Sequence, residues 1–221
     1  DSGLEGSFRF LTRVWRLVTG LRGLVIDAPR DALGKKLDDA HRTLRRKTHD
    51  TISRVSADLD PRAHLNTAVS ALMELVNDLY SFCEHQHLPL QTDGVESALP
   101  SSAPEETRAV LQEAIEVLVL MLSPFTPHVC EELWEQLGRT TGLGREEWPV
   151  FDPVVARAET IVVPVQVNGK LRARLTVPLD ASKADLQEAA LAESTVRGHV
   201  ANKTIVRVVV VAGKLVNIVA R

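Results

Sequence analysis

The sequence predicts a multidomain, mainly α protein in which a five-helix bundle precedes a small α+β domain of ββ-helical-ββ order. Three observations lead to this fold class. Apolar residues recur at three- and four-residue steps through most of residues 1–137, the period of helices with one buried face. Residues 160–221 instead alternate apolar and polar residues around two short glycine-containing turns, which is typical of β-hairpins. Between these regions, glycine and proline break the chain repeatedly.

Length and composition are those of an ordinary globular chain. It has 221 residues, of which 44% are hydrophobic and 25% are charged, enough for one or two domains. We find no apolar stretch long enough to cross a bilayer and no signal peptide, so we expect no membrane partner and a cytoplasmic location. Cys83 and Cys130 lie in apolar helical patterns and are expected to be reduced. Because the first residue is not Met, we expect a piece of a longer polypeptide.

Charge is distributed unevenly along the chain. The net charge of −3 by itself argues against a nucleic-acid partner. However, residues 30–54 carry eight Lys or Arg against four Asp, and residues 160–221 carry nine against four acids. Positive fields confined to two segments are expected of a protein that holds a phosphate backbone on chosen surfaces; ordinary charge scatter is the alternative.

The first helix is predicted over Leu4–Leu21, and Gly and Pro residues within 20–29 mark its exit. Arg9, Arg13 and Arg16 lie off its apolar stripe. The residues of that stripe, which recur at three- and four-residue steps, are Leu4, Phe8, Leu11, Trp15 and Val18.

A long second helix is predicted over Asp31–Leu59, with an apolar stripe from Leu33 to Leu59. Basic side chains lie opposite or beside that stripe, and four of them fall within residues 42–47 without an interleaved acid. A solvated helix face is the plain explanation, but we favour a helix that contacts phosphates. Its candidate residues are Arg42, Arg45, Arg46, Lys47 and His49.

A third helix is predicted over Asn66–Gln86, with Asn66 as its cap. Cys83, His85 and His87 have no standard zinc spacing and lack a second pair of ligands, so we predict no metal site. A polar loop over residues 88–104 then leads to a fourth helix that opens at Glu105. The buried face of the third helix is predicted to be Ala68, Leu72, Leu75, Val76, Leu79 and Phe82.

A sharp corner separates the fourth helix from the fifth. Ser123-Pro124 ends the fourth helix, because proline disfavours the α region for the residue before it. Thr126 is expected as the next N-cap and Pro127 as the first helical residue, where its missing N–H costs nothing. The fifth helix follows over His128–Leu137, with Leu133 among its buried residues.

Residues 138–153 are predicted to leave the bundle, with Trp148 packed back on the helices and a domain boundary near Arg157. We therefore expect two domains, residues 1–157 and residues 158–221.

The second domain is predicted to open with a hairpin of Ile161–Val167 and Leu171–Val177. Asn168-Gly169 usually forms a two-residue type I′ turn, but such a turn would mix valines and cations on one face. A loop of odd length keeps Ile161, Val163 and Val165 on one face with Leu171, Ala173 and Leu175. We therefore predict a three-residue loop, Val167-Asn168-Gly169, with Gly169 left-handed in a bulge. The side chains expected on the open face are Gln166, Lys170, Arg172 and Arg174.

The rest of this domain is predicted to be helical and then a second hairpin. Ser182 and Asp185 form a capping-box pattern before a helix, and Ser194–Val200 is expected to form a short helical turn. Thr204–Val211 and Lys214–Val219 are expected to pair as strands. Further candidate phosphate-contacting side chains in this domain are Lys203, Arg207, Lys214 and Asn217.

Several motifs resemble those of a known family. S-P-F-T-P-H at residues 123–128, followed by E-E-L-W, resembles the anticodon-binding bundle that the leucine, isoleucine, valine and methionine class I aminoacyl-tRNA synthetases share. V-Q-V-N-G-K-L-R at residues 165–172 and A-G-K-L-V-N-I-V at residues 212–219 resemble the C-terminal domain of bacterial leucyl-tRNA synthetases. So do R-R-K-T-H-D-T-I at residues 45–52, N-T-A-V-S-A-L-M-E-L-V-N at residues 66–77, and W-P-V-F-D from Trp148. The resemblance covers almost the whole chain in the right order.

The resemblance implies a parent enzyme that attaches leucine to tRNA(Leu) using ATP and Mg²⁺, with an editing domain that hydrolyses mischarged tRNA. The family's H-I-G-H and K-M-S-K-S signatures are absent here, and nothing in the sequence replaces them. We therefore expect no catalytic residue, cofactor or metal in this chain, and no activity from it alone. It resembles the part of the enzyme that holds the tRNA. In the family, the bundle lies along the inner side of the tRNA, and the tail reaches its elbow and long variable arm.

The expected partners are tRNA(Leu) and the catalytic and editing domains of the same polypeptide, with the chain monomeric. Two alternatives remain open. One is the same region of a valine, isoleucine or methionine enzyme, which only a coiled-coil or zinc-bearing tail would favour. The other is a helical protein-interaction scaffold, which requires an exposed apolar groove.

Overall fold

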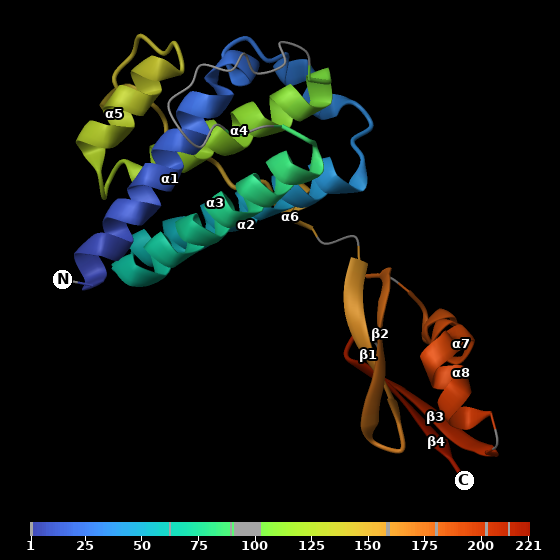
Figure 1. Ribbon diagram of the computed structural model, residues 1–221. Coiled ribbons are helices and arrows are strands. Elements are labelled where there is room, and N and C mark those ends of the chain that lie inside the picture. Colours follow the sequence, from blue (N-terminus) through green and yellow to red (C-terminus); the bar gives the residue numbers. More distant parts are fainter. Residues whose placement is uncertain are drawn as a thin grey trace. The chain divides into compact units, whose positions relative to one another are not determined.

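The computed structural model describes residues 2–61, 63–88, 90, 103–157, 160–179, 181–201, 203–211 and 213–221. The chain forms two compact units, Asp1–Arg157 and Ala158–Arg221 (Figure 1). The first unit is helical, and the second combines a four-stranded mixed sheet with helices, so the protein is mostly helical with a small α+β unit. Among the described residues, no helix has the length and apolar character needed to cross a membrane.

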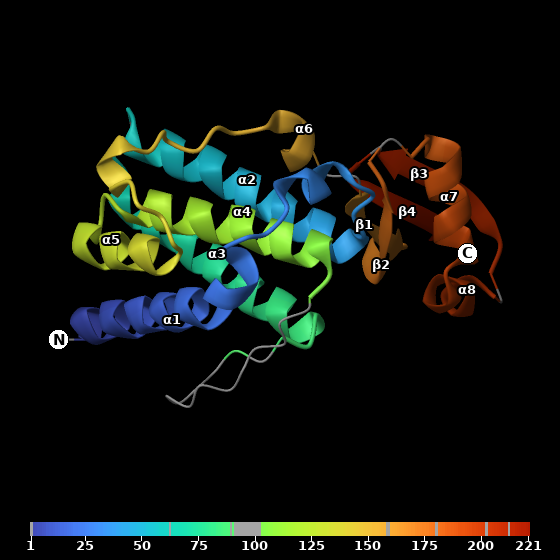
Figure 2. The same cartoon turned by 90° about the horizontal axis from the view of Figure 1, so that it is seen from above.

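The first unit packs its helices around α4, which contacts α1, α2, α3 and α5 (Figure 2). Ile115, Leu118 and Met121 of α4 are fully buried; burying one such side chain contributes about 1.5–3 kcal/mol. The bounds are α1 Ser2–Val25, α2 Asp39–Leu59, α3 Leu65–His85, α4 Glu105–Leu122, α5 Pro127–Gln136 and α6 Pro153–Ala156, with 3₁₀ turns η1 Arg30–Gly34 and η2 Leu143–Arg145.

The apolar stripe predicted for the first helix is buried only in part. Leu4 and Phe8 are 77% and 70% exposed, whereas Val14 and Leu17 are fully buried. Two adjacent faces of α1 are apolar. The face of Val14, Leu17 and Leu21 joins the core, together with Val18 and in part Leu11 from the predicted stripe, whereas the face of Leu4 and Phe8 stays exposed. Periodicity alone could not tell these two faces apart.

The second helix begins later than predicted, at Asp39 instead of Asp31. Residues 30–34 form η1, and Lys35 after it is extended. Asp38 is the N-cap of α2, and its side chain accepts a hydrogen bond from the backbone N–H of His41 at 2.9 Å. Beyond that start, the predicted apolar stripe is confirmed, and Leu44 and Ile52 are buried.

The next three helices agree with the sequence except at their caps. α3 buries the predicted face, and α4 has the predicted bounds. Asn66 does not cap α3, because that helix begins at Leu65 and its N-cap position is His64. Thr126 and Pro127 occupy the predicted N-cap and N1 positions of α5. Most of the predicted polar loop, residues 91–102, lies outside the described residues.

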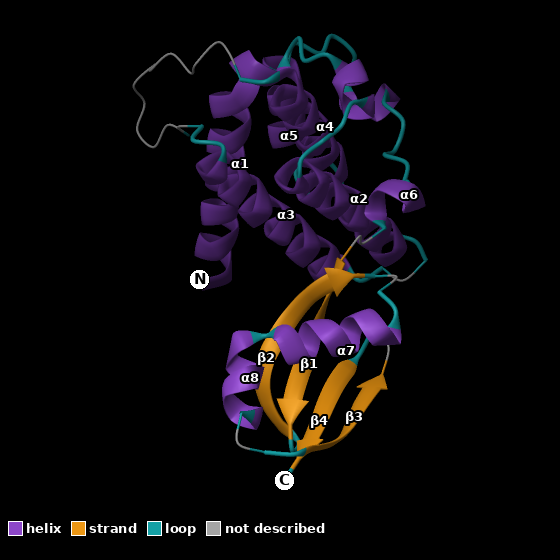
Figure 3. Ribbon diagram, turned by 90° about the vertical axis from the view of Figure 1, so that its right-hand side faces the viewer, coloured by secondary structure: helices purple, strands orange, loops and turns teal. Residues whose placement is uncertain are grey.

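In the second unit, α7 and α8 cover one face of the sheet (Figure 3). The strand order is β2-β1-β4-β3, in which β1 and β4 are parallel and the other neighbours are antiparallel. Val165, Ile218, Leu186 and Val196 meet in the core between sheet and helices. The capping box of Ser182 and Asp185 is confirmed. The bounds are β1 Thr160–Val167, β2 Lys170–Pro178, α7 Lys183–Ala192, α8 Ser194–Val200, β3 Ile205–Val211 and β4 Leu215–Ala220.

The predicted three-residue loop of the first hairpin is wrong. Val167 pairs with Lys170, which leaves a two-residue turn of Asn168 and Gly169 with φ values of 52° and 78°, the type I′ geometry. The extra residue lies inside β2, because Val165 pairs with Ala173 while Gln166 pairs with Leu171. Arg172 therefore occupies a bulge that keeps the valines of β1 opposite Ala173 and Leu175. As a consequence, Leu171 is exposed instead of buried.

Candidate nucleic-acid interface

The basic residues of α2 are largely paired with acids from other helices. Arg45 donates from Nε and Nη2 to the two carboxylate oxygens of Glu113 on α4, at 2.7 and 3.0 Å. Lys47 binds Glu74 of α3 at 2.7 Å, and Arg54 binds the same carboxylate at 2.6 Å. Hydrogen bonds from Arg54 and Lys47 lower the pKa of Glu74 to about 2. These cations hold the bundle together.

His49 lies inside the first unit. Its Nδ1 accepts a hydrogen bond from the backbone N–H of Asp152 at 3.1 Å, so its Nε2 carries the proton that points at Glu113, 3.4 Å away. Trp148 Nε1 donates to Ser56 Oγ of α2 at 2.8 Å, in keeping with the prediction that Trp148 packs back on the bundle. The segment that leaves the bundle therefore runs along α2 (Figure 2), over part of the face on which the sequence placed phosphates.

Two predicted residues of α2 remain. Arg42 bonds to Asp39 and to the carbonyl of Leu37. Arg46 is half-buried and, in the part of the chain that the structure describes, has no ion pair or hydrogen bond from its side chain. Sequence reasoning missed the pairing because Glu74 and Glu113 lie 27 and 68 residues away from their partners.

In the second unit, by contrast, no described cation takes part in an ion pair. The described acids of this unit are Asp185, Glu188 and Glu193, all on α7 or at its junction with α8. Hydrogen bonds from the side chain and the backbone N–H of Ser182 lower the pKa of the Asp185 carboxyl at the start of α7, and a hydrogen bond from the backbone N–H of Val196 lowers the pKa of the Glu193 carboxyl at the start of α8. The described acids of this unit therefore lie on its helical side, together with Lys183 and Arg197.

The strand register places two cations on the face that the helices leave uncovered, called the open face below. Arg174 lies opposite Pro164, and Arg207 lies opposite Val219. Side chains of cross-strand partners share a face, and the other face is filled by the core. The exposed apolar side chains Val162 and Leu171 share the open face with them.

The other predicted residues of this unit lie at its margins. Lys170 follows the β1–β2 turn opposite Val167, Arg172 lies in the bulge, and Lys203 and Lys214 are exposed next to the ends of β3. Lys170 therefore does not share the open face with Gln166 as predicted. Asn217 has a structural contact, because its Oδ1 accepts a hydrogen bond from the N–H of Gly169 at 3.2 Å.

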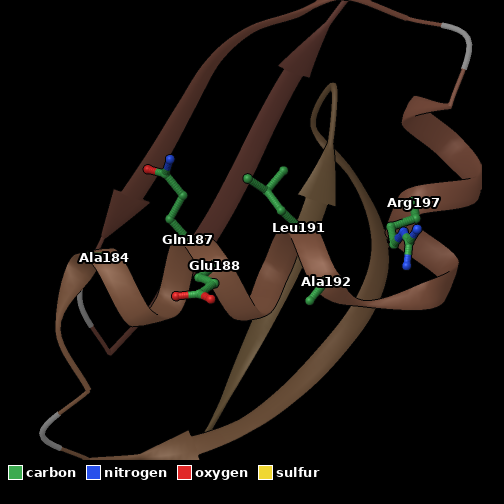
Figure 4. Close-up of a pocket in the computed structure, with 6 residues that line it drawn as sticks. All are labelled: Ala184, Gln187, Glu188, Leu191, Ala192 and Arg197. Atoms are coloured by element: carbon green, nitrogen blue, oxygen red, sulfur yellow. The ribbon is translucent and has the colours of Figure 1, made fainter.

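Two hollows are lined by described residues, one in each unit. One of about 540 Å³ lies between α7 and α8, where Figure 4 shows Gln187, Leu191 and Arg197 among small side chains. Another of about 520 Å³ lies in the first unit, where Arg30 and Arg139 both bind Glu116. Within the described ranges, no three His, Cys, Asp or Glu side chains gather as a metal site would require.

The two cysteines, Cys83 and Cys130, are both buried free thiols. Burial raises the pKa of Cys83 to about 12 and that of Cys130 to about 11, and a reactive cysteine requires the opposite shift.

Cations on a sheet that have no ion pair among the described residues, with the described acids on the other side, are typical of the nucleic-acid-binding class of proteins. Comparison with known proteins agrees. Residues 41–188, which include parts of both units, match the family described as the anticodon-binding domain of tRNA ligase, and the chain belongs to that family.

The relatives extend this finding over the whole chain. It is 42% identical over 219 residues to the leucine–tRNA ligase of Syntrophobacter fumaroxidans, covering 99% of this chain and 25% of that protein. It is 44% identical over 220 residues to that of Geotalea uraniireducens, covering 99% and 24%. The chain thus spans about a quarter of the length of these curated relatives.

A solved structure is similar as well. It is described as the ternary complex of Agrobacterium radiobacter K84 agnB2 LeuRS, tRNA and LeuAMS. It matches all of this chain with a TM-score of 0.71 and 29% identity, over 26% of its own length.

Proposed function

We propose that this chain is the tRNA-holding portion of a leucine–tRNA ligase and that its partner is tRNA(Leu). The leucine–tRNA ligase relatives and the tRNA in the similar solved structure support this proposal. In it, α1–α5 are the five-helix anticodon-binding-type bundle of residues 1–157, and residues 158–221 are the tRNA-binding tail.

The observation that carries the proposal is the contrast between the two sets of cations. Those of α2 are mostly engaged by Glu74 and Glu113, whereas those of the tail have no acid partner among the described residues. Guanidinium and ammonium groups on the tail would hold phosphates with little readout of bases. The tail residues proposed for this are Lys170, Arg172, Arg174, Lys203, Arg207 and Lys214, joined by Arg46, the cation predicted on α2 that has no described partner.

The remaining predicted residues act indirectly in this proposal. Arg42, Arg45, Lys47 and His49 keep α2 in place, and Asn217 holds the β1–β2 turn.

In this proposal, domains outside this chain carry out the chemistry of the parent reaction. Catalytic and editing domains of the same polypeptide, in the cytoplasm, would use ATP and Mg²⁺ to attach leucine and would remove mischarged products. This chain, as a monomer, would bind no cofactor and position the acceptor end of the tRNA for those domains.

The test is the salt dependence of tRNA(Leu) binding to the chain and to variants of the open face. Arg174→Gln and Arg207→Gln should each lower the slope of log K against log salt by about 0.7–0.9. The matched control is Arg197→Gln on α8, which removes the same charge from the helical side and should leave the slope unchanged. Equal effects of all three variants would mean that the protein's overall charge, rather than the open face, attracts the RNA.

One observation favours a protein-contact role as a second candidate function. Leu4, Phe8 and Trp15 form an exposed apolar stripe on α1. Single exposed apolar residues are common on protein surfaces, but a contiguous group of them is typical of an interaction site. If the chain is a scaffold instead, Phe8→Ser will abolish partner binding, and tRNA will not bind even at 50 mM salt.

A further inference from the structure

Three arginines lie on one face of α1, outside the interface described above. At 100° per residue, Arg9, Arg13 and Arg16 fall within an arc of about 60° and extend over about 10 Å of the helix. The buried face of Val14 and Leu17 lies at a different angle. The exposed apolar side chains of α1 lie on yet another flank.

Contacts with α3 fix this arginine face without neutralising it. The guanidinium carbon of Arg13 lies 4.8 Å from the centre of the Tyr80 ring, and Tyr80 Oη donates to the carbonyl of Arg13 at 2.9 Å. Arg9 is 3.8 Å from Glu5, and both side chains are about 70% exposed, a geometry worth little. Arg16 forms no ion pair with any residue that the structure describes.

The charges nearest this face confirm that the cations gather there. Burial raises the pKa of Tyr80, and the positive charges of both Arg13 and Arg16 oppose that rise, so both lie close to the ring. On α3, the acid one turn beyond Tyr80 is Glu84, which joins none of the ion pairs found in the described ranges. Three cations therefore face outward with two exposed acids, Glu5 and Glu84, near them, which leaves an excess of positive charge among the described residues.

We infer that Arg9, Arg13 and Arg16 form a second phosphate-binding surface, on the bundle, for the backbone of the same RNA that the tail holds. This inference rests on the proposed function. Guanidinium groups bind phosphate oxygens in pairs of hydrogen bonds. A protein partner would instead need a buried apolar anchor at the centre of its site, and the exposed Phe8 and Trp15 lie on another flank of α1.

The size of the effect follows from counterion release. Each phosphate contact contributes about 0.7–0.9 to the salt slope. A contact with a slope of 0.9 is worth about eightfold in affinity at 0.1 M salt. Losing Arg13 and Arg16 together should therefore weaken binding by roughly 60-fold at that salt concentration and lower the slope by about 1.4–1.8.

The experiment compares Arg13→Gln, Arg16→Gln and their double variant with wild-type chain in salt titrations with tRNA(Leu). Arg22→Gln is the matched control, because it removes the same charge from the same helix, where Arg22 donates to Gln136 of α5. The Arg16→Gln variant shows whether a loss of binding comes from misfolding. Because Arg16 has no ion pair among the described residues, the melting temperature of this variant should match that of the wild type. Hydroxyl-radical footprinting of the bound tRNA then shows which stretch of backbone each variant exposes.

The inference predicts that Arg13→Gln and Arg16→Gln each lower the slope and expose one backbone stretch, different from the stretch exposed by Arg174→Gln. It is overturned if the α1 variants match Arg22→Gln while Arg174→Gln lowers the slope; the proposed function then stands. If the folded wild-type chain shows no salt-sensitive binding at 50 mM salt, the proposed function and this inference both fall.

Discussion

Replacing Arg45 by Gln should destabilise the first unit without changing how the chain binds RNA. The substitution leaves the Glu113 carboxylate, whose side chain is 19% exposed, without its two shortest hydrogen bonds. Removing one partner of a buried ion pair costs about 3–5 kcal/mol. The residual exposure reduces this cost, so we expect about 2–3 kcal/mol. For a unit of this size, each kcal/mol lowers the melting temperature by about 2–4 °C, which predicts a fall of about 4–12 °C.

The measurement is thermal unfolding followed by circular dichroism, with Arg46→Gln as the matched control. Arg46 is the next residue on the same helix and has no described partner, so its loss should change stability by less than about 0.5 kcal/mol. The double variant of Arg45 and Glu113 should recover part of the lost stability, because neither charge is then left alone. If Arg45→Gln melts like the wild type and lowers the tRNA salt slope, Arg45 contacts phosphate and the structural assignment is wrong.

Three further predictions concern single residues. Asn168→Ala should lower the free energy of unfolding of the tail in urea by about 1–3 kcal/mol, because it loses two hydrogen bonds to Ala220 and places alanine at a positive φ. Asn168→Gly removes only the hydrogen bonds and should lower the free energy of unfolding by less. Equal losses would show that the backbone at this position carries no strain. Ser182→Ala should cost about 1 kcal/mol through the lost cap of α7, and an unchanged unfolding midpoint would contradict this. The pKa of Glu74 is lowered, so its ion pairs contribute stability above pH 4.5, and this stability is lost as the pH falls toward about 2. An NMR titration of the Glu74 carboxyl should give a pKa near 2, and a pKa near 4.5 would contradict the prediction.

Features set by neighbouring residues could be predicted from the sequence. The capping box of Ser182 and the corner at Thr126 and Pro127 depend on side chains within a few residues of each other, and the structure has both. The bounds of α4 followed from Glu105 and Ser123-Pro124. In each case residues that lie close together in the sequence determine where the helix begins or ends.

Features set by distant residues could not be predicted. The sequence shows four cations within residues 42–47 but not that Glu113 lies across from Arg45. The alternation of side chains in the first hairpin requires one extra residue. Only the strand pairing of the structure shows that this residue is Arg172, inside β2, and not a residue of the loop. The burial of His49 likewise depends on Asp152, 103 residues away. For this reason the sequence could not show that most of the cations predicted to bind phosphate on α2 form ion pairs within the first unit.

We propose that the chain holds tRNA(Leu) through cations that have no acid partner among the residues that the structure describes. The most direct test titrates the wild-type chain with tRNA(Leu) and with a tRNA of short variable arm at several salt concentrations. The account predicts salt-sensitive binding to both and tighter binding to tRNA(Leu). Absence of binding at 50 mM salt by a chain shown to be folded would contradict it.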